Sequence, residues 1–353
     1  MVRAVERAVF RSSRVDGPIS LTHRHAELAE HHGALAILAE HPGWVDPLLQ
    51  ERARDARRRQ ALWESHFLPR TQAIVQGLSE VGVRAVPLKG MAICPEYPQR
   101  GWRPFSDADL WIDRDQVRTA HTYLSHEGFE PLPSQSPLPK AQPNLGDPIE
   151  ACEAGIDALG YQKQGYGLEV HTVLLPPMLG RYPGHGMDDV DRLNHFLIHA
   201  VRHHFSHGLR HPLDLALWID RKKPSIDAAI ERLRECGLYD LAWPAWQIAT
   251  DHFPDRIAPW PKPARRFSIA YAKRLGMDFE RVPELSKGFA GSPLPCLMMV
   301  DRSFSALANA WGGSPEIRRY REGKTSVGTL RRLTRTLVRH GKIALRWATF
   351  WIG

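Results

Sequence analysis

The chain has 353 residues, of which 43% are hydrophobic and 24% are charged, and 47 Lys and Arg against 39 Asp and Glu give a net charge of +8. This composition is typical of a folded globular protein and excludes a disordered chain, a collagen-like fibre and a disulfide-rich scaffold. The length is enough for two or three structural units, and the positive charge favours an anionic partner such as a nucleotide, RNA or a membrane surface.

Residues 1–80 are predicted to be helical. Apolar side chains between residues 28 and 38 form one set, and a longer pattern from Pro47 to Glu80 is charged at first and apolar afterwards. Gly82 follows this pattern and is expected to end the helix.

Between residues 81 and 178 the pattern changes to short apolar runs that predict a mixed α/β core. Helices are expected at residues 91–97 and 115–127, with a proline-rich loop at 131–148. Strands are expected at residues 83–88, 109–113, 156–164 and 168–175, the last two joined by a turn at 165–167.

The chain from residue 179 onward is again predicted to be helical. The expected helices span residues 191–220, 225–236, 240–252, 264–275, 294–311 and 327–350. The fold class is therefore α+β, a small mixed β-sheet flanked by N- and C-terminal helical regions. We divide the chain into residues 1–80, 81–178 and 179–353.

The excess positive charge lies near the C-terminus. Residues 315–346 carry ten basic side chains and two acidic ones, so the rest of the chain is neutral overall. This segment contributes most of the last predicted helix, whose basic side could be a solvated face, a surface for RNA or another polyanionic acceptor, or an anchor at a membrane surface.

The cysteines and the apolar runs indicate the cellular compartment in which the protein is expected. Four scattered cysteines without a CxxC pair are typical of a reducing cytosol. No apolar run reaches the roughly 18 residues that a transmembrane segment needs, and the Arg-rich N-terminus lacks the apolar region of a secretory signal. We expect a cytoplasmic protein.

Two carboxylates near a strand start are the first candidate functional residues. Asp107 and Asp109, in the run SDADLWID, project to the same side of the predicted strand because side chains alternate along a strand. Two close carboxylates repel each other unless a cation lies between them, so the pair predicts a magnesium (or manganese) site. Glu169, in LEVH on a later strand, is the best candidate for a third acid, and His171 shares its face.

Basic residues surround this pair in the sequence. Lys89 and Gly90 come directly after the first strand, and Arg100 and Arg103 come just before the acids. Glycine allows a phosphate to approach the backbone closely, while Lys and Arg side chains can contact triphosphate oxygens. Trp102, between the two arginines, could stack on a base.

At this point the motifs resemble a known family. The run LKG followed by GWRPFSDADLWI is similar to the uncharacterised nucleotidyltransferase family of the DNA polymerase beta superfamily. LEVH and the segment from His195 to Leu217 resemble its later strand and helices, so the resemblance covers about residues 60 to 220. It implies a small mixed sheet flanked by helices, divalent-metal chemistry on an NTP such as ATP, and Asp107 and Asp109 as metal ligands.

The resulting expectation is an enzyme that transfers an NMP from an NTP to an acceptor and releases pyrophosphate. The acceptor could be a small molecule, a peptide or protein, or an RNA end. Lys89-Gly90 stands where the superfamily usually has Gly-Ser, and Glu169 stands where the family commonly has Asp. The alternative is a nucleotide-binding protein without turnover that acts through a partner. The residues expected to contact the nucleotide are Lys89, Gly90, Arg100, Arg103, Ser106 and His171.

Histidines are concentrated in the helical segment that follows. His195, His199 and His203 are spaced four residues apart, which places them on one helical face and is compatible with zinc. Packing against the catalytic sheet and a location near the nucleotide remain alternatives. Asp214, in PLDLAL, could contact the metal-binding residues without binding the metal itself, or it could simply be an N-terminal residue of a helix.

Overall fold

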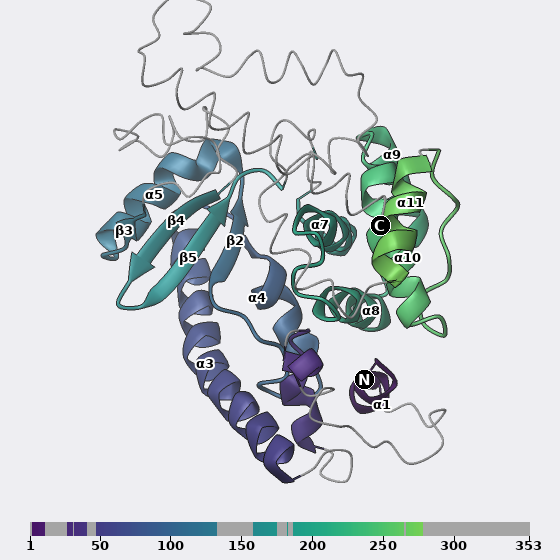
Figure 1. Cartoon of the computed structure of the whole chain (residues 1–353). Helices are drawn as coiled ribbons and strands as arrows, with labels where there is room; N and C mark the ends of the chain where they lie inside the picture. The colour runs from purple at the N-terminus through teal and green to yellow at the C-terminus, as the bar shows by residue number, and fades with distance from the viewer. Residues whose placement is uncertain are drawn as a thin grey trace, which may run out of the picture.

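The computed structural model describes residues 2–10, 27–30, 32–40, 47–132, 158–174, 182, 186–264 and 266–277. In this part of the chain a small mixed sheet lies between helices on both sides (Figure 1). This arrangement confirms the α+β class predicted from the sequence. The helices predicted at 294–311 and 327–350, and with them the basic C-terminal segment, lie outside the described residues.

The described strands form one sheet in the order β1-β2-β5-β4-β3. Strands β2 and β5 run parallel, whereas the other neighbouring pairs are antiparallel. The register places Asp109 of β2 opposite Glu169 of β5. The bounds are β1 Ala85–Pro87, β2 Ala108–Ile112, β3 Glu130–Pro131, β4 Ala158–Lys163 and β5 Tyr166–His171.

The two faces of the sheet have different partners. Leu110 of β2 and Val170 of β5 are buried with apolar side chains of α3 (Pro47–Glu80) and α5 (Val117–His126). Because side chains alternate along a strand, Asp109, Trp111, Glu169 and His171 lie on the opposite face. Trp111 belongs to the same buried cluster as apolar side chains of the C-terminal helices, so the polar residues of this face point toward those helices.

The long helix α3 confirms the prediction for residues 47–80, although it contains Pro69. Gly82 has a φ of +79°, and the Val83 N–H donates a hydrogen bond of 2.8 Å to the Leu78 carbonyl. This left-handed glycine ends the helix as expected and directs the chain into β1. Three short helices frame the strands that follow, α4 Lys89–Ile93, η3 Cys94–Glu96 and η4 Arg114–Gln116.

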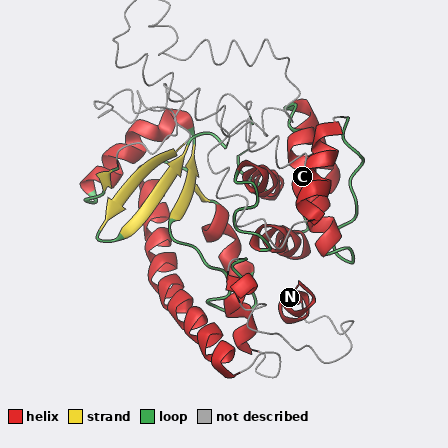
Figure 2. Cartoon of the chain, in the orientation of Figure 1, coloured by secondary structure: helices red, strands yellow, loops and turns green. Residues whose placement is uncertain are grey.

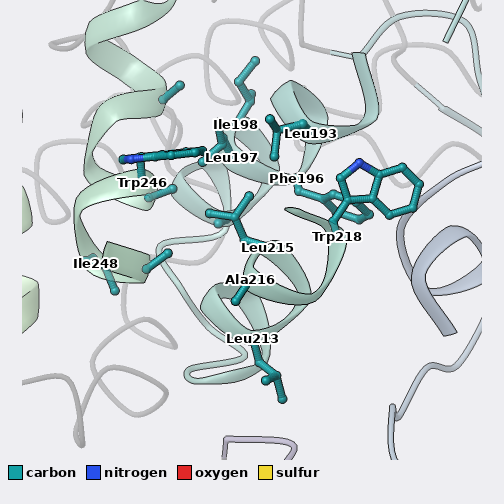
Figure 3. Packing of buried hydrophobic residues seen from close by; sticks show 14 of the residues in the cluster. Leu193, Phe196, Leu197, Ile198, Leu213, Leu215, Ala216, Trp218, Trp246 and Ile248 are labelled. Atoms are coloured by element: carbon teal, nitrogen blue, oxygen red, sulfur yellow. The ribbon is translucent and has the colours of Figure 1, made fainter. Parts of the chain in front are cut away.

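The C-terminal helices form a second layer beside the sheet, and Figure 2 shows the described strands to one side of these helices. Apolar side chains of α7, α8 and α10 pack together there, among them Leu197, Leu215 and Trp246 (Figure 3). No described helix has the length and apolar character needed to cross a membrane. The bounds are α7 Asp189–Arg202, α8 Arg210–Lys222, α9 Ile226–Glu235, α10 Tyr239–His252 and α11 Arg266–Met277, with α1 Val2–Phe10 and η1 Leu35–Glu40 from the N-terminal region.

The prediction of one helix over residues 191–220 is wrong. The chain forms α7 and α8 with a turn between them, in which His204, Phe205 and Gly208 have φ values of +49°, +54° and +52°. The apolar pattern continues on both sides of this turn, so periodicity alone did not reveal the break. The turn brings histidines from the end of α7 and the start of α8 side by side.

The hairpin turn also differs from the prediction at residues 165–167. Its two central residues are Gln164 and Gly165, with φ values of +50° and +76°, and Tyr166 already belongs to β5. Two consecutive positive φ values are typical of the tight turns that join antiparallel strands. The Tyr166 ring stacks on Phe67 of α3 with centroids 4.5 Å apart, which favours this register.

Candidate active site

The parallel pairing of β2 and β5 brings two of the predicted acids together. Ligand atoms of Asp109, Glu169 and His171 all lie within 4.8 Å of one another. The Asp109 side chain is only 4% exposed, whereas that of Glu169 is 42% exposed. The group therefore has a buried side at β2 and opens to solvent at β5.

Asp107 lies immediately before β2 and is half-buried. The Ser106 hydroxyl, on an exposed residue, donates to an Asp107 carboxylate oxygen at 3.2 Å. Burial raises the pKa of Asp107, and the nearby carboxylates of Asp109 and Glu169 raise it further. We call Asp107, Asp109 and Glu169 the acid cluster; a cation placed among these three residues would relieve their mutual repulsion.

Lys89 supplies such a positive charge from the chain itself. Its Nζ lies 2.6 Å from Asp109 Oδ1 and 3.5 Å from Glu169 Oε2. Lys89 is the first residue of α4 and has a φ of +45°, which is uncommon for a residue with a side chain. The backbone before it is held to the sheet, since the Leu88 N–H donates to the Asp109 carbonyl at 2.8 Å.

His171 completes the contacts of Asp109. Its Nε2 lies 3.0 Å from Asp109 Oδ1 and 3.5 Å from Glu169 Oε2. Burial alone would raise the pKa of Asp109, but Lys89 and His171 outweigh it and hold that pKa well below the usual range. Burial lowers the pKa of Lys89, yet the two acids outweigh it and raise the pKa above the ordinary value. Asp109 is therefore ionised and Lys89 protonated at neutral pH.

The remaining basic residues of the motif lie in different surroundings. Arg100 is exposed, whereas Arg103 is buried and its Nη2 lies 2.8 Å from an Asp214 carboxylate oxygen on α8. The Tyr97 hydroxyl donates to the other Asp214 oxygen at 2.7 Å. Arg103 thus forms a buried ion pair, and Asp214, which the sequence left between two interpretations, is its counter-charge.

Gly90 and Trp102 contact their own chain. A Cβ atom at Gly90 would lie 2.6 Å from a guanidinium nitrogen of Arg103 and 2.8 Å from the Phe105 Cβ, so glycine lets that segment pack on α4. The Trp102 side chain is 3% exposed and belongs to the larger apolar core. Its position in the core does not fit the expectation that it stacks on a base.

Comparison with protein families gives one match. Residues 22–254, well over half of the chain, match the family described as uncharacterised nucleotidyltransferase. The chain belongs to this family. Searches of curated proteins and of solved structures gave no match. The matched segment contains the acid cluster, Lys89 and Asp214, and it confirms the resemblance found from the sequence.

In this nucleotidyltransferase, α7 lies against the acid cluster. His195 is buried, and its pKa is lowered well below the ordinary value by burial, then by Lys89 and His171. In the described part of the chain, Asp109, Glu169 and His171 are the one group of three or more side chains close enough to share a metal ion. The zinc hypothesis for His195, His199 and His203 therefore gains no support from the geometry.

Proposed function

We propose that this nucleotidyltransferase transfers an NMP from an NTP to an acceptor with release of pyrophosphate, using Mg²⁺ or Mn²⁺ held by Asp107, Asp109 and Glu169. The observation that carries the proposal is the pairing of Asp109 with Glu169 across two parallel strands, with Asp107 beside them. Membership of the nucleotidyltransferase family supports the reaction class.

The donor set fits a hard divalent cation. The three residues offer carboxylate oxygens, which Mg²⁺ and Mn²⁺ prefer, and the repulsion that raises the pKa of Asp107 favours a cation there. The ammonium group of Lys89 lies between Asp109 and Glu169, so positive charge is already accommodated between these carboxylates. When bound, the metal would supply charge neutralisation for the phosphates and help to align the attacking oxygen.

The chain's own residues prepare the site for that chemistry. His171 contacts Asp109 and limits its rotation, and Ser106 donates to Asp107. Our proposed nucleotide contacts remain Lys89, Gly90, Arg100, Arg103, Ser106 and His171, of which Lys89 and His171 lie beside Asp109. We propose a positioning role for Arg103, which holds the segment before the acids against α8 through Asp214.

The test is a transfer assay with labelled NTP, Mg²⁺ and a panel of acceptors that includes small hydroxylated molecules, peptides and RNA. Asp109→Asn and Glu169→Gln should lower pyrophosphate release by about 100-fold or more, because each removes a charge that the metal needs. Asp113→Asn, just beyond the end of β2, is the matched control and should keep its activity. Transfer that survives in Asp109→Asn would refute the assignment.

One observation favours the alternative, a nucleotide-binding protein without turnover. Lys89 neutralises Asp109 and Glu169 with a cation of the chain, so these acids are satisfied without a metal. Calorimetry that detects nucleotide binding, combined with no transfer to any acceptor, would support this alternative. Any pyrophosphate release that depends on Asp109 would exclude it.

We also propose that the acceptor is a polyanion such as RNA, contacted by residues 315–346. The support for this partner is the charge of that segment, ten basic residues against two acidic ones. Binding of RNA should then weaken steeply with salt, and deletion of residues 315–353 should remove the salt dependence. Unchanged RNA binding after the deletion would contradict the proposal.

A further inference from the structure

A group of histidines gathers where α7 turns into α8. The ring centroids of His199 and His203 lie 4.2 Å apart, those of His199 and His211 5.7 Å, and those of His207 and His211 5.3 Å. All four side chains are half-buried, so part of each is open to solvent. Together with Arg210, which begins α8, we call them the histidine–arginine cluster.

Arg210 has an unusual environment within this cluster. Its Nη1 donates to the Pro104 carbonyl at 3.1 Å, and Arg103 donates to the same oxygen at 3.0 Å. Arg103 has Asp214 as its counter-charge, but Arg210 forms no ion pair with an acid of the described residues. The Nε of Arg210 and the Nε2 of His211 are buried without a hydrogen-bond partner in the described part of the chain. The described residues therefore leave the hydrogen-bonding capacity of these two nitrogens unused.

The charges around the cluster are predominantly positive. Burial, followed by the charges of Arg202 and Lys89, lowers the pKa of His203 to about 3. Burial likewise lowers the pKa of His207 to about 3, with Arg210 as the next cause. The charged groups that face these histidines are Lys89 from α4, Arg103 from the loop before β2, Arg202 from α7, and Arg210 and Asp214 from α8. Two acids also face Arg210: Asp214, which is already paired with Arg103, and Asp107 of the acid cluster.

The cluster lies next to the acid cluster. Arg210 donates to the carbonyl of Pro104, three residues before Asp107, so the start of α8 lies against the segment that leads into the acid cluster. In agreement with this placement, Lys89 lowers the pKa values of His199, His203 and His207. A ligand reaching the acids from the side of α8 would therefore meet imidazole N–H groups and an unpaired guanidinium. These groups donate hydrogen bonds to anionic oxygens, and a guanidinium can bind phosphate through two parallel bonds.

We propose that Arg210, His203, His207 and His211 form a phosphate-binding subsite beside the acid cluster. The inference deepens the proposed function, because it names the chemistry that the enzyme holds next to its metal. The phosphate could come from the NTP, as the groups that leave as pyrophosphate, or from a phosphorylated acceptor. Both sources present the same anionic oxygens to the cluster.

The experiment is calorimetric titration of the full chain with inorganic pyrophosphate in metal-free buffer. Arg210→Gln should weaken binding about tenfold or more, since it removes a charge-assisted contact. Arg221→Gln, also on α8 but exposed and outside the cluster, is the matched control and should bind like the wild type. His207→Asn provides a second variant in case Arg210→Gln fails to fold, and it should also weaken binding.

Two further titrations, with ATP and with a 5′-phosphorylated RNA oligonucleotide, separate the sources. Weaker ATP binding by Arg210→Gln with unchanged oligonucleotide binding assigns the subsite to the NTP, and the reverse assigns it to the acceptor. Wild-type affinity of Arg210→Gln and His207→Asn for all three probes, or no binding of any probe by the wild type, would overturn the proposal. The titrations need neither metal nor turnover, so their outcome is independent of the Asp109→Asn transfer assay.

Discussion

The buried ion pair between Arg103 and Asp214 joins the segment before the acid cluster to α8, and it permits a quantitative prediction. The side chains are 8% and 4% exposed, and Tyr97 donates to the same carboxylate. Arg210 contributes a second guanidinium on the shared Pro104 carbonyl. Asp214→Asn preserves the shape of the side chain but leaves the Arg103 guanidinium without its carboxylate.

The expected loss of stability follows from the burial of the pair. Removing one partner of a buried ion pair generally lowers the free energy of unfolding by about 3–5 kcal/mol, because the remaining charge is left uncompensated. Each kcal/mol shifts the Tm of a domain of 150–250 residues by about 2–4 °C, so we expect the Tm to fall by roughly 10 °C. Tyr97→Phe removes one hydrogen bond to the same carboxylate and should lower the free energy of unfolding by about 1–2 kcal/mol.

Thermal and urea unfolding, followed by circular dichroism, measure both effects. The double variant Arg103→Met with Asp214→Asn should be more stable than the sum of the two single losses implies, because the pair is removed together. The reasoning fails if Asp214→Asn unfolds no earlier than Tyr97→Phe, or if the two losses in the double variant are additive.

Two other predictions concern charge. Lys89→Met should bind Mn²⁺ about tenfold more tightly in calorimetry, because the ammonium group no longer competes with the metal for Asp109 and Glu169. Its transfer activity should fall, and an unchanged Mn²⁺ affinity would contradict the competition. The second prediction concerns the pH dependence of stability. In the folded protein the pKa values of His203 and His207 lie at about 3, below the value of about 6.5 in the unfolded chain. The unfolded chain therefore takes up protons first as the pH falls. These histidines should leave the free energy of unfolding constant above pH 6.5 and lower it by about 1.4 kcal/mol per pH unit for each histidine between pH 6.5 and 3. Urea unfolding at several pH values measures this dependence. His207→Asn should show a shallower slope of unfolding free energy against pH than the wild type, and equal slopes would refute the assignment.

The acid cluster could be predicted because its geometry depends on local rules. Asp107 and Asp109 are two residues apart at a strand start, and the alternation of side chains places such residues on one face. The Gly82 helix end and α3 follow from equally local patterns. The pairing of β2 with β5, which brings Glu169 to Asp109, connects residues sixty positions apart; Glu169 was proposed as the third acid from its strand pattern, but no local rule fixes this pairing.

Long-range contacts explain what sequence reasoning missed. The ion pair of Arg103 with Asp214 could not be predicted, because Asp214 lies 111 residues further along the chain than this arginine of the motif. The break between α7 and α8 depends on positive φ values at His204 and Phe205, which are not glycines. Only the tertiary packing of the two helices reveals that their histidines share one cluster.

The cations near the acid cluster are therefore not equivalent. Lys89 is paired with Asp109 and Glu169, and Arg103 is paired with Asp214. Of these three basic side chains in the described structure, Arg210 is the one without an acidic partner. A negatively charged ligand gains most where positive charge is desolvated and unneutralised, since no existing ion pair has to be broken. This difference favours an approach of the phosphate from the side of α8.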